Sequence, residues 1–169
     1  MKVSVPLENG LLADKYGKYA SGDQIKNGKP IISFPIEFAD IPSDAKYLAF
    51  TFTDPGSIPV CGFEWIHWTV ANIPVSMPSL PENFSQSAPD EIIQGKNSSA
   101  SPLLSGNLPE LMNGYNGPYP SDQTHDYILK AYALDEKLDI QSGFWMNELL
   151  HKMNGHMIAH CRFVIPSRA

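Results

Sequence analysis

Apolar and polar residues alternate along five segments of the chain, and this pattern predicts β-strands. Successive side chains of a strand point to opposite faces, so alternation gathers the apolar ones on one face. The segments are rich in β-branched and aromatic residues and are bounded by clusters of Asn, Gly, Pro, Asp and Ser. They cover residues 30–38, 47–54, 65–73, 125–134 and 156–165. Strands dominate, which predicts an all-β fold of two packed sheets.

One segment has the period of a helix instead. Residues 143–154 carry an apolar stripe with four-residue spacing, made of Trp145, Leu149 and Met153. Ser142 is the expected N-cap, and an Asn-Gly pair closes the helix. Shorter helical turns are expected at residues 89–91 and 109–110, because Pro suits the first helical position.

A long irregular segment separates the third strand from the fourth. Residues 94–124 are mostly Ser, Asn, Gly and Pro and show little periodicity. Connections of this length in a compact domain are usually functional or mobile. The segment ends directly before a strand that begins with His125.

Length and charge narrow the function. The chain has 169 residues without an internal repeat or a linker-like charge run, so residues 1–169 are expected to form one domain. The formal net charge is −6 and the pI is about 5.2. Such a chain has no basic stripe to displace counterions from phosphates, which argues against nucleic acid. The same charge disfavours docking on an anionic membrane surface.

The N-terminal residues and the two cysteines bear on the cellular compartment of the protein. The first ten residues hold no apolar run of signal-peptide length, and no later segment is long enough to span a membrane. Cys61 and Cys161 lie 100 positions apart and form no metal or redox motif. We therefore expect a cytoplasmic protein whose cysteines are small hydrophobes in or near the core, although one disulfide stays open.

Two strands end in polar side chains where an apolar stripe stops. Residues 47–54 place Leu48, Phe50, Phe52 and Asp54 on one face. Asp54 therefore lies at the rim of the sheet, either in a site or in an Asx-turn. The strand at 125–134 starts with His125 and places Tyr127 on the same face. Before it, Gly117 permits a close backbone approach, and exposed amides near it could bind an oxygen anion.

His67 occupies an inner position of the third strand. Strict alternation puts it on one face with Trp65, Thr69 and Ala71. This face lacks the run of aliphatic side chains that a purely structural strand would show. His67 is then either a core histidine with a buried hydrogen-bond partner or a residue that faces a pocket.

The same residues carry a family resemblance. The stretches TDP at 53–55, EWIHWTVANIP at 64–74 and YNGPYPSDQTHDY at 115–127, the last followed by ALD, resemble the phosphatidylethanolamine-binding protein family. Its animal members include the Raf kinase inhibitor protein, and the spacing is most similar to the bacterial Raf-kinase-inhibitor-like branch. The resemblance implies two antiparallel sheets with a few peripheral helices, and a small pocket that holds phosphate or a phosphorylated head group.

Carried over position by position, the resemblance assigns seven residues to that pocket: Asp54, Trp65, His67, Gly117, Pro118, His125 and Tyr127. His67 and His125 would donate hydrogen bonds to the anion and, when protonated, supply positive charge. Tyr127 would add a neutral donor. Asp54 would repel a phosphate, so it is expected to orient or charge a histidine or to accept the ammonium of a zwitterionic ligand.

Three positions depart from the family pattern. Gly56 stands where relatives often carry a second acid, and Asp126 replaces an arginine next to the strand histidine. Ser121 replaces the last proline of the loop. These changes affect the identity of the ligand and the entrance of the pocket more than the fold.

Two classes of function follow. The first is a binding protein without a cofactor or a reaction of its own, whose relatives imply modulation of a protein kinase or protease partner and a homodimer. The second is a hydrolase that uses the same pocket. It would hold a metal on Asp54, His67 and His125, or it would use the histidines as acid and base. Ser57 and Ser121 lie in loops without a nucleophile motif, so the first class is favoured.

Overall fold

A computed structural model describes residues 1–105 and 108–169. Its strands are β1 (Lys2–Ser4), β2 (Ile25–Lys26), β3 (Lys29–Pro30), β4 (Ile36–Ala39), β5 (Tyr47–Asp54), β6 (Trp65–Pro74), β7 (Ser79–Leu80), β8 (Ile93–Gln94), β9 (His125–Leu134) and β10 (Met157–Ser167). The α-helices are α1 (Ile58–Cys61), α2 (Phe84–Ser87) and α3 (Met146–Lys152). Short 3-10 helices are η1 (Asp14–Tyr16), η2 (Gly22–Gln24), η3 (Pro55–Ser57), η4 (Ser98–Ala100) and η5 (Pro109–Leu111).

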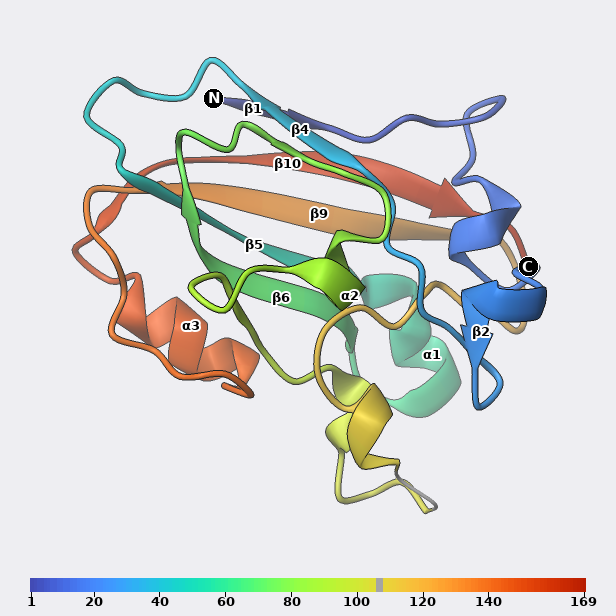
Figure 1. Cartoon of the computed structure of the whole chain (residues 1–169). Helices are drawn as coiled ribbons and strands as arrows, with labels where there is room; N and C mark the ends of the chain where they lie inside the picture. The colour runs from blue at the N-terminus through green and yellow to red at the C-terminus, as the bar shows by residue number, and fades with distance from the viewer. Residues whose placement is uncertain (106–107) are drawn as a thin grey trace.

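The main strands form two antiparallel sheets, as the family resemblance implies. The larger sheet has the order β10-β9-β5-β6-β8, and the smaller has the order β1-β4-β7. β2 and β3 make a separate hairpin. Figure 1 shows β1 and β4 over one side of the long strands β10, β9, β5 and β6, with α3 on the other side. The predicted all-β fold with a few short helices is confirmed.

The main core lies between the two sheets. Val3, Ile36 and Phe38 from the small sheet cluster with Phe50, Trp68 and Leu129 from the large one. A second cluster fills the opposite face of the large sheet, where Leu149 of α3 packs with Ala49 and Ala71. The large sheet is therefore buried on both faces along its centre, which explains why β5 and β6 are almost continuously buried.

The pairing of β5 with β6 is interrupted next to His67. Phe52 lies opposite Trp68, but Thr53 lies opposite Ile66, so β6 contains one extra residue between these pairs. A bulge of this kind resets the alternation of side chains. The predicted common face is therefore wrong: His67 contacts the ring of Phe52 on the main-core side, whereas Ala71 packs on the opposite side of the sheet.

The predicted strand at residues 30–38 is only partly present. Pro30 ends the β2-β3 hairpin, and β4 begins after Pro35. Proline has no N–H to donate to a ladder, so the segment between them does not pair as a strand. Phe34 lies in this irregular segment and is nevertheless fully buried in the main core.

The late helix is shorter than predicted. α3 covers Met146–Lys152, and its N-cap is Trp145, which makes no side-chain capping hydrogen bond. Gly143 has a φ of +78°, a left-handed conformation that separates Ser142 from the helix, so Ser142 is not the cap. Pro109 does begin a short helix, η5, whereas Pro89 accepts a hydrogen bond from Ile92 in a turn.

The irregular segment at residues 94–124 is confirmed in its described part. It contains the short helices η4 and η5 but no strand after Gln94. In Figure 1 it extends below the large sheet and returns past α1. Within the described ranges, no helix has the length and hydropathy needed to cross a membrane.

Candidate functional site

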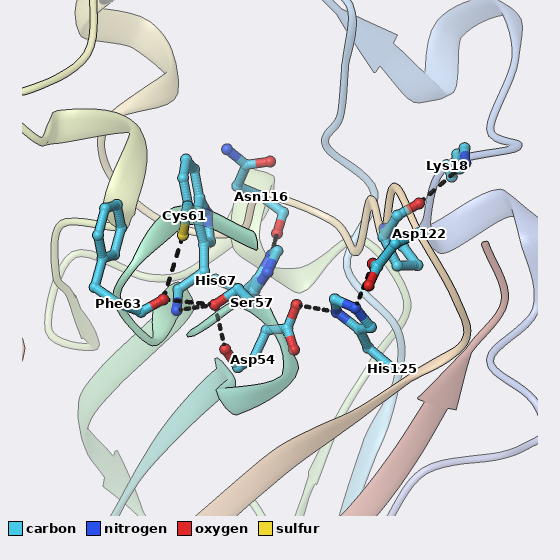
Figure 2. A network of polar contacts seen from close by, with 11 residues as sticks. Lys18, Asp54, Ser57, Cys61, Phe63, His67, Asn116, Asp122 and His125 are labelled. Atoms are coloured by element: carbon cyan, nitrogen blue, oxygen red, sulfur yellow. Dashed lines mark hydrogen bonds and ion pairs between the residues drawn. The ribbon is translucent and has the colours of Figure 1, made fainter. Parts of the chain in front are cut away.

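A cavity of about 180 Å³ opens where β5, β6 and β9 meet the end of the irregular segment. Six of the seven predicted residues line it: Asp54, Trp65, His67, Gly117, His125 and Tyr127. Figure 2 shows Asp54, His67 and His125 converging from three different strands. The strand ends, far apart in the sequence, are therefore brought together as the pattern predicts.

Asp54 and His125 form a buried pair at the base of the cavity. The Nδ1 of His125 donates to Oδ2 of Asp54 over 2.8 Å, and both residues are at most 4% exposed. The Nε2 of the same ring donates to Oδ1 of Asp122 over 2.9 Å, on the outer side (Figure 2). Burial lowers the pKa of His125, but the two carboxylates outweigh burial and raise it above its ordinary value. Asp54 thus orients and charges a histidine, one of its two expected roles.

His67 is a neutral histidine. Its Nδ1 lies 2.6 Å from the carbonyl oxygen of Asn116 (Figure 2). Burial lowers the pKa of His67 to about 4, and the hydrogen bond to Asn116 opposes this only in part. The expectation that His67 supplies positive charge is therefore wrong, because charging it inside the protein costs too much. It is both a core histidine with a buried partner and a residue that lines the cavity.

Tyr127 keeps its proton throughout the physiological range. Burial raises the pKa of its hydroxyl, and the neighbouring charge of Asp54 raises it further. The ring packs edge-on against His67 at a centroid distance of 5.1 Å. Tyr127 is therefore available as the neutral hydrogen-bond donor that the resemblance implies.

The backbone near Gly117 approaches its neighbours closely but offers no free amide of its own. The N–H of Gly117 donates to the carbonyl of Pro30, and that of Asn116 donates to the carbonyl of His67. The amides of Asn116 and Gly117 are therefore not available to an anion, and an anion contact at the neighbouring amides stays a prediction. Pro118 is buried against Gly17 and does not line the cavity, so its assignment to the site is wrong.

We expect Gly117→Ala to destabilise the fold by about 1–3 kcal/mol through steric overlap. An added Cβ at this position would lie 2.3 Å from the carbonyl oxygen of Tyr16 and 2.7 Å from the Cβ of Pro30. Gly10→Ala is the comparison without steric overlap: no atom lies within 4 Å of its added Cβ, and only the backbone strain of a φ of +82° remains, about 1 kcal/mol. Urea unfolding of both variants measures the difference, and equal losses would contradict the steric explanation.

The sequence reasoning missed Lys29, Asn116 and Cys61, all of which line the cavity. Lys29 comes from the β2-β3 hairpin, and no ion pair involves it in residues 1–105 and 108–169. No local motif marks it, because the hairpin reaches the cavity only through the fold. Cys61 is an exposed free thiol rather than the core residue that was expected, whereas Cys161 packs against the main core.

The three departures from the family pattern have different surroundings. A Cβ at position 56 would lie 2.9 Å from the imidazole of His125, so Gly56 lets that ring pack against η3. Asp126 is exposed and pairs with Pro166 on the face away from His125. Ser121 lines the mouth of the cavity, in place of a proline.

Metal binding at this site was an alternative prediction. Among the described residues, no group of three His, Cys, Asp or Glu side chains is arranged to hold a metal ion. The nitrogens that would be ligands are also engaged, because both ring nitrogens of His125 contact carboxylates.

Comparison with known proteins decides the family. The family model for phosphatidylethanolamine-binding protein matches residues 3–165. The chain belongs to this family. A protein of Bacillus subtilis named only as uncharacterized, YxkA, is 50% identical over 160 residues, which is 95% of each chain. A UPF0098 protein of Methanothermobacter thermautotrophicus is 33% identical over 79% of this chain and 80% of its own length.

Solved structures of family members have the same fold. A putative phosphatidylethanolamine-binding protein homologue from Chlamydia trachomatis is 30% identical, with a TM-score of 0.72 over 94% of this chain and 90% of that chain. YbcL of Escherichia coli, described as a member of the mammalian family, has a TM-score of 0.75 over 99% of this chain and 98% of that chain, at 23% identity. These relatives confirm the resemblance to the bacterial branch of the family.

Proposed function

We propose that this protein binds phosphate or a phosphorylated small molecule in the cavity and carries out no reaction there. The observation that carries the proposal is the burial of Asp54, His67 and His125 around one cavity, at 3–4% exposure each. Burying ionisable groups costs free energy that an apolar residue would not cost. Their convergence on a cavity therefore supports a binding role rather than a contribution to stability.

The charges around the cavity support an anionic ligand. Asp54 and His125 form an internal pair whose charges largely offset each other, and Asp122, the second carboxylate on His125, does not line the cavity. Lys29 then contributes a positive charge without an ion-pair partner among the described residues. Tyr127 adds a hydroxyl donor. Trp65 and Val60 line the wall, and a partly enclosed site strengthens each polar contact.

The polar contacts do not favour the hydrolase alternative. The Ser57 hydroxyl lies 2.6 Å from the backbone oxygen of Asp54 and 2.8 Å from that of Phe63, and no described histidine is hydrogen-bonded to it. A serine nucleophile needs an adjacent general base within hydrogen-bond reach. The regulation of a kinase or protease, the homodimer and the cytoplasmic location stay predictions.

Ligand binding is expected to raise the melting temperature. O-phosphorylethanolamine or inorganic phosphate at 100 times its dissociation constant should stabilise the protein by about 2.7 kcal/mol. Lys29→Met should weaken binding by roughly tenfold or more, because it removes a charge-assisted contact. Thermal shift and isothermal titration calorimetry on the full chain measure both effects.

Lys26→Met is the matched control for this experiment. Lys26 lies directly opposite Lys29 in the β2-β3 hairpin but does not line the cavity. Lys26→Met changes the net charge by the same amount as Lys29→Met. It should leave the dissociation constant within about twofold of the wild-type value. If neither ligand raises the melting temperature, the proposed function is refuted. If Lys29→Met and Lys26→Met lose the same binding affinity, the role of Lys29 is refuted.

A further inference from the structure

The cavity is lined by more hydrogen-bond acceptors than an anion site needs. The Asn116 carbonyl can only accept, so the hydrogen between it and His67 must be on Nδ1. A neutral imidazole that donates through Nδ1 has a lone pair on Nε2. His67 therefore offers an acceptor, not a donor, to a ligand in the cavity.

Asp54 adds a negative charge beside this acceptor. Its Oδ2 receives a hydrogen bond from His125, and its Oδ1 is buried 3.0 Å from where a Cβ of residue 56 would lie. Asp54 lines the same cavity as His67, so a ligand there meets both the lone pair of His67 and this carboxylate.

Most donors near the cavity are already occupied. Both nitrogens of His125 donate to carboxylates, and the amides of Asn116 and Gly117 donate to backbone carbonyls. Lys29 and the hydroxyls of Tyr127, Tyr119 and Ser121 remain as donors on the cavity lining. These donors, together with the acceptor nitrogen of His67, suit a ligand that can both accept and donate.

We propose that the cavity selects an oxyanion that carries its own proton, namely phosphate or the monoanion of a phosphate monoester, and rejects fully ionised oxyanions such as sulfate. This inference rests on the proposed function and specifies its ligand. The oxygen atoms of the ligand accept from Lys29 and Tyr127, and its P–OH group donates to an acceptor of the wall. Sulfate has no proton near neutral pH, so it would leave the Nε2 of His67 unpaired and face the carboxylate of Asp54.

The charged and titratable groups around the cavity set the charge and the hydrogen-bond donors and acceptors that a ligand meets. They are Lys29 from β3, Asp54 from β5, Cys61 from the end of α1, His67 from β6, and His125 and Tyr127 from β9, with Tyr119 at the mouth and Asp122 behind His125. Lys18 lies further out, where it donates to the carbonyl of Pro120. His67 would have to be protonated to donate to sulfate through Nε2, and its pKa of about 4 makes that unfavourable at neutral pH.

The inference is tested by calorimetry on the full chain with four ligands at equal ionic strength and pH 7.5. Inorganic phosphate is expected to bind at least about tenfold more tightly than sulfate. Dimethyl phosphate has no proton to donate and should bind as weakly as sulfate. Methyl phosphate loses its second proton near pH 6, so its affinity should rise by about tenfold or more between pH 8 and pH 6.

The variant Asp54→Asn provides the second arm. Its amide removes the negative charge and can donate, so the preference for phosphate over sulfate should narrow to within about threefold. The dimethyl phosphate comparison uses the wild type and holds even if this variant is unstable. Equal binding of phosphate, sulfate and dimethyl phosphate to the wild type would overturn the inference while leaving the proposed function intact. Failure of all four ligands to bind would refute the proposed function itself.

Discussion

Replacing His125 with alanine is expected to lower the free energy of unfolding by about 3–5 kcal/mol. The Nδ1 of His125 donates to Asp54 over 2.8 Å, and Asp54 is 3% exposed. The variant leaves a buried carboxylate without its partner, which is more damaging than the loss of the imidazole itself. Urea unfolding at pH 7, followed by tryptophan fluorescence, measures the change.

Two further variants distinguish the contribution of the buried Asp54–His125 pair from that of the exposed Asp122–His125 pair. Asp122→Ala removes only the outer contact of His125. The Asp122 side chain is 46% exposed, so this variant should lower the free energy of unfolding by less than about 1 kcal/mol. Asp54→Asn combined with His125→Ala should be more stable than His125→Ala alone, because no charge is then left buried. If the double variant is as unstable as the sum of the single variants, charge burial is not the cause.

Phe34→Ala is expected to cost about 3–5 kcal/mol as well. Phe34 is fully buried, and four aromatic rings surround it in edge-on contacts, from Tyr16, Phe52, Trp68 and Tyr115. Its removal leaves a cavity between the two sheets that the neighbouring rings cannot fill. The same urea experiment measures the loss.

Phe34→Leu and Leu103→Ala complete this series. The leucine keeps much of the volume at position 34 and should cost less than the alanine. Leu103 is 82% exposed, so its truncation should change stability by no more than about 0.5 kcal/mol. A Phe34→Ala variant close to the wild type in stability would show that the rings do not hold the sheets together.

The aromatic core around Phe34 also supports the candidate site. Phe52 contacts Phe34 on one side and the ring of His67 on another, at centroid distances of 5.0 and 5.7 Å. The base of the cavity is therefore built directly on the aromatic core. A loss of packing at Phe34 should accordingly weaken ligand binding as well as stability, whereas Leu103→Ala should affect neither.

The strands that carry the site could be predicted from local patterns. β5 and β9 pair without a break in register, and residues 47–54 and 125–134 coincide with the observed strands. The polar side chains at their ends, Asp54 and His125, follow from the same alternation. Period and composition suffice here because neighbouring residues alone decide which way a strand side chain points.

Features that depend on pairing between strands could not be predicted in this way. The bulge beside His67 exists only relative to β5, and no single strand reveals it. Lys29 reaches the cavity because a separate hairpin folds over it, and Phe34 is buried although its own segment forms no strand. Such positions are set by contacts between residues far apart in the chain.

The protonation states show this division most clearly. The sequence by itself determined an all-β architecture and a histidine near the start of each of two strands, because both follow from local alternation and from motif spacing. Only the tertiary structure decided that His67 is neutral and that His125 is held between two carboxylates. The charge of an imidazole depends on its burial and on the groups within a few ångströms of it, and these are supplied by distant parts of the chain.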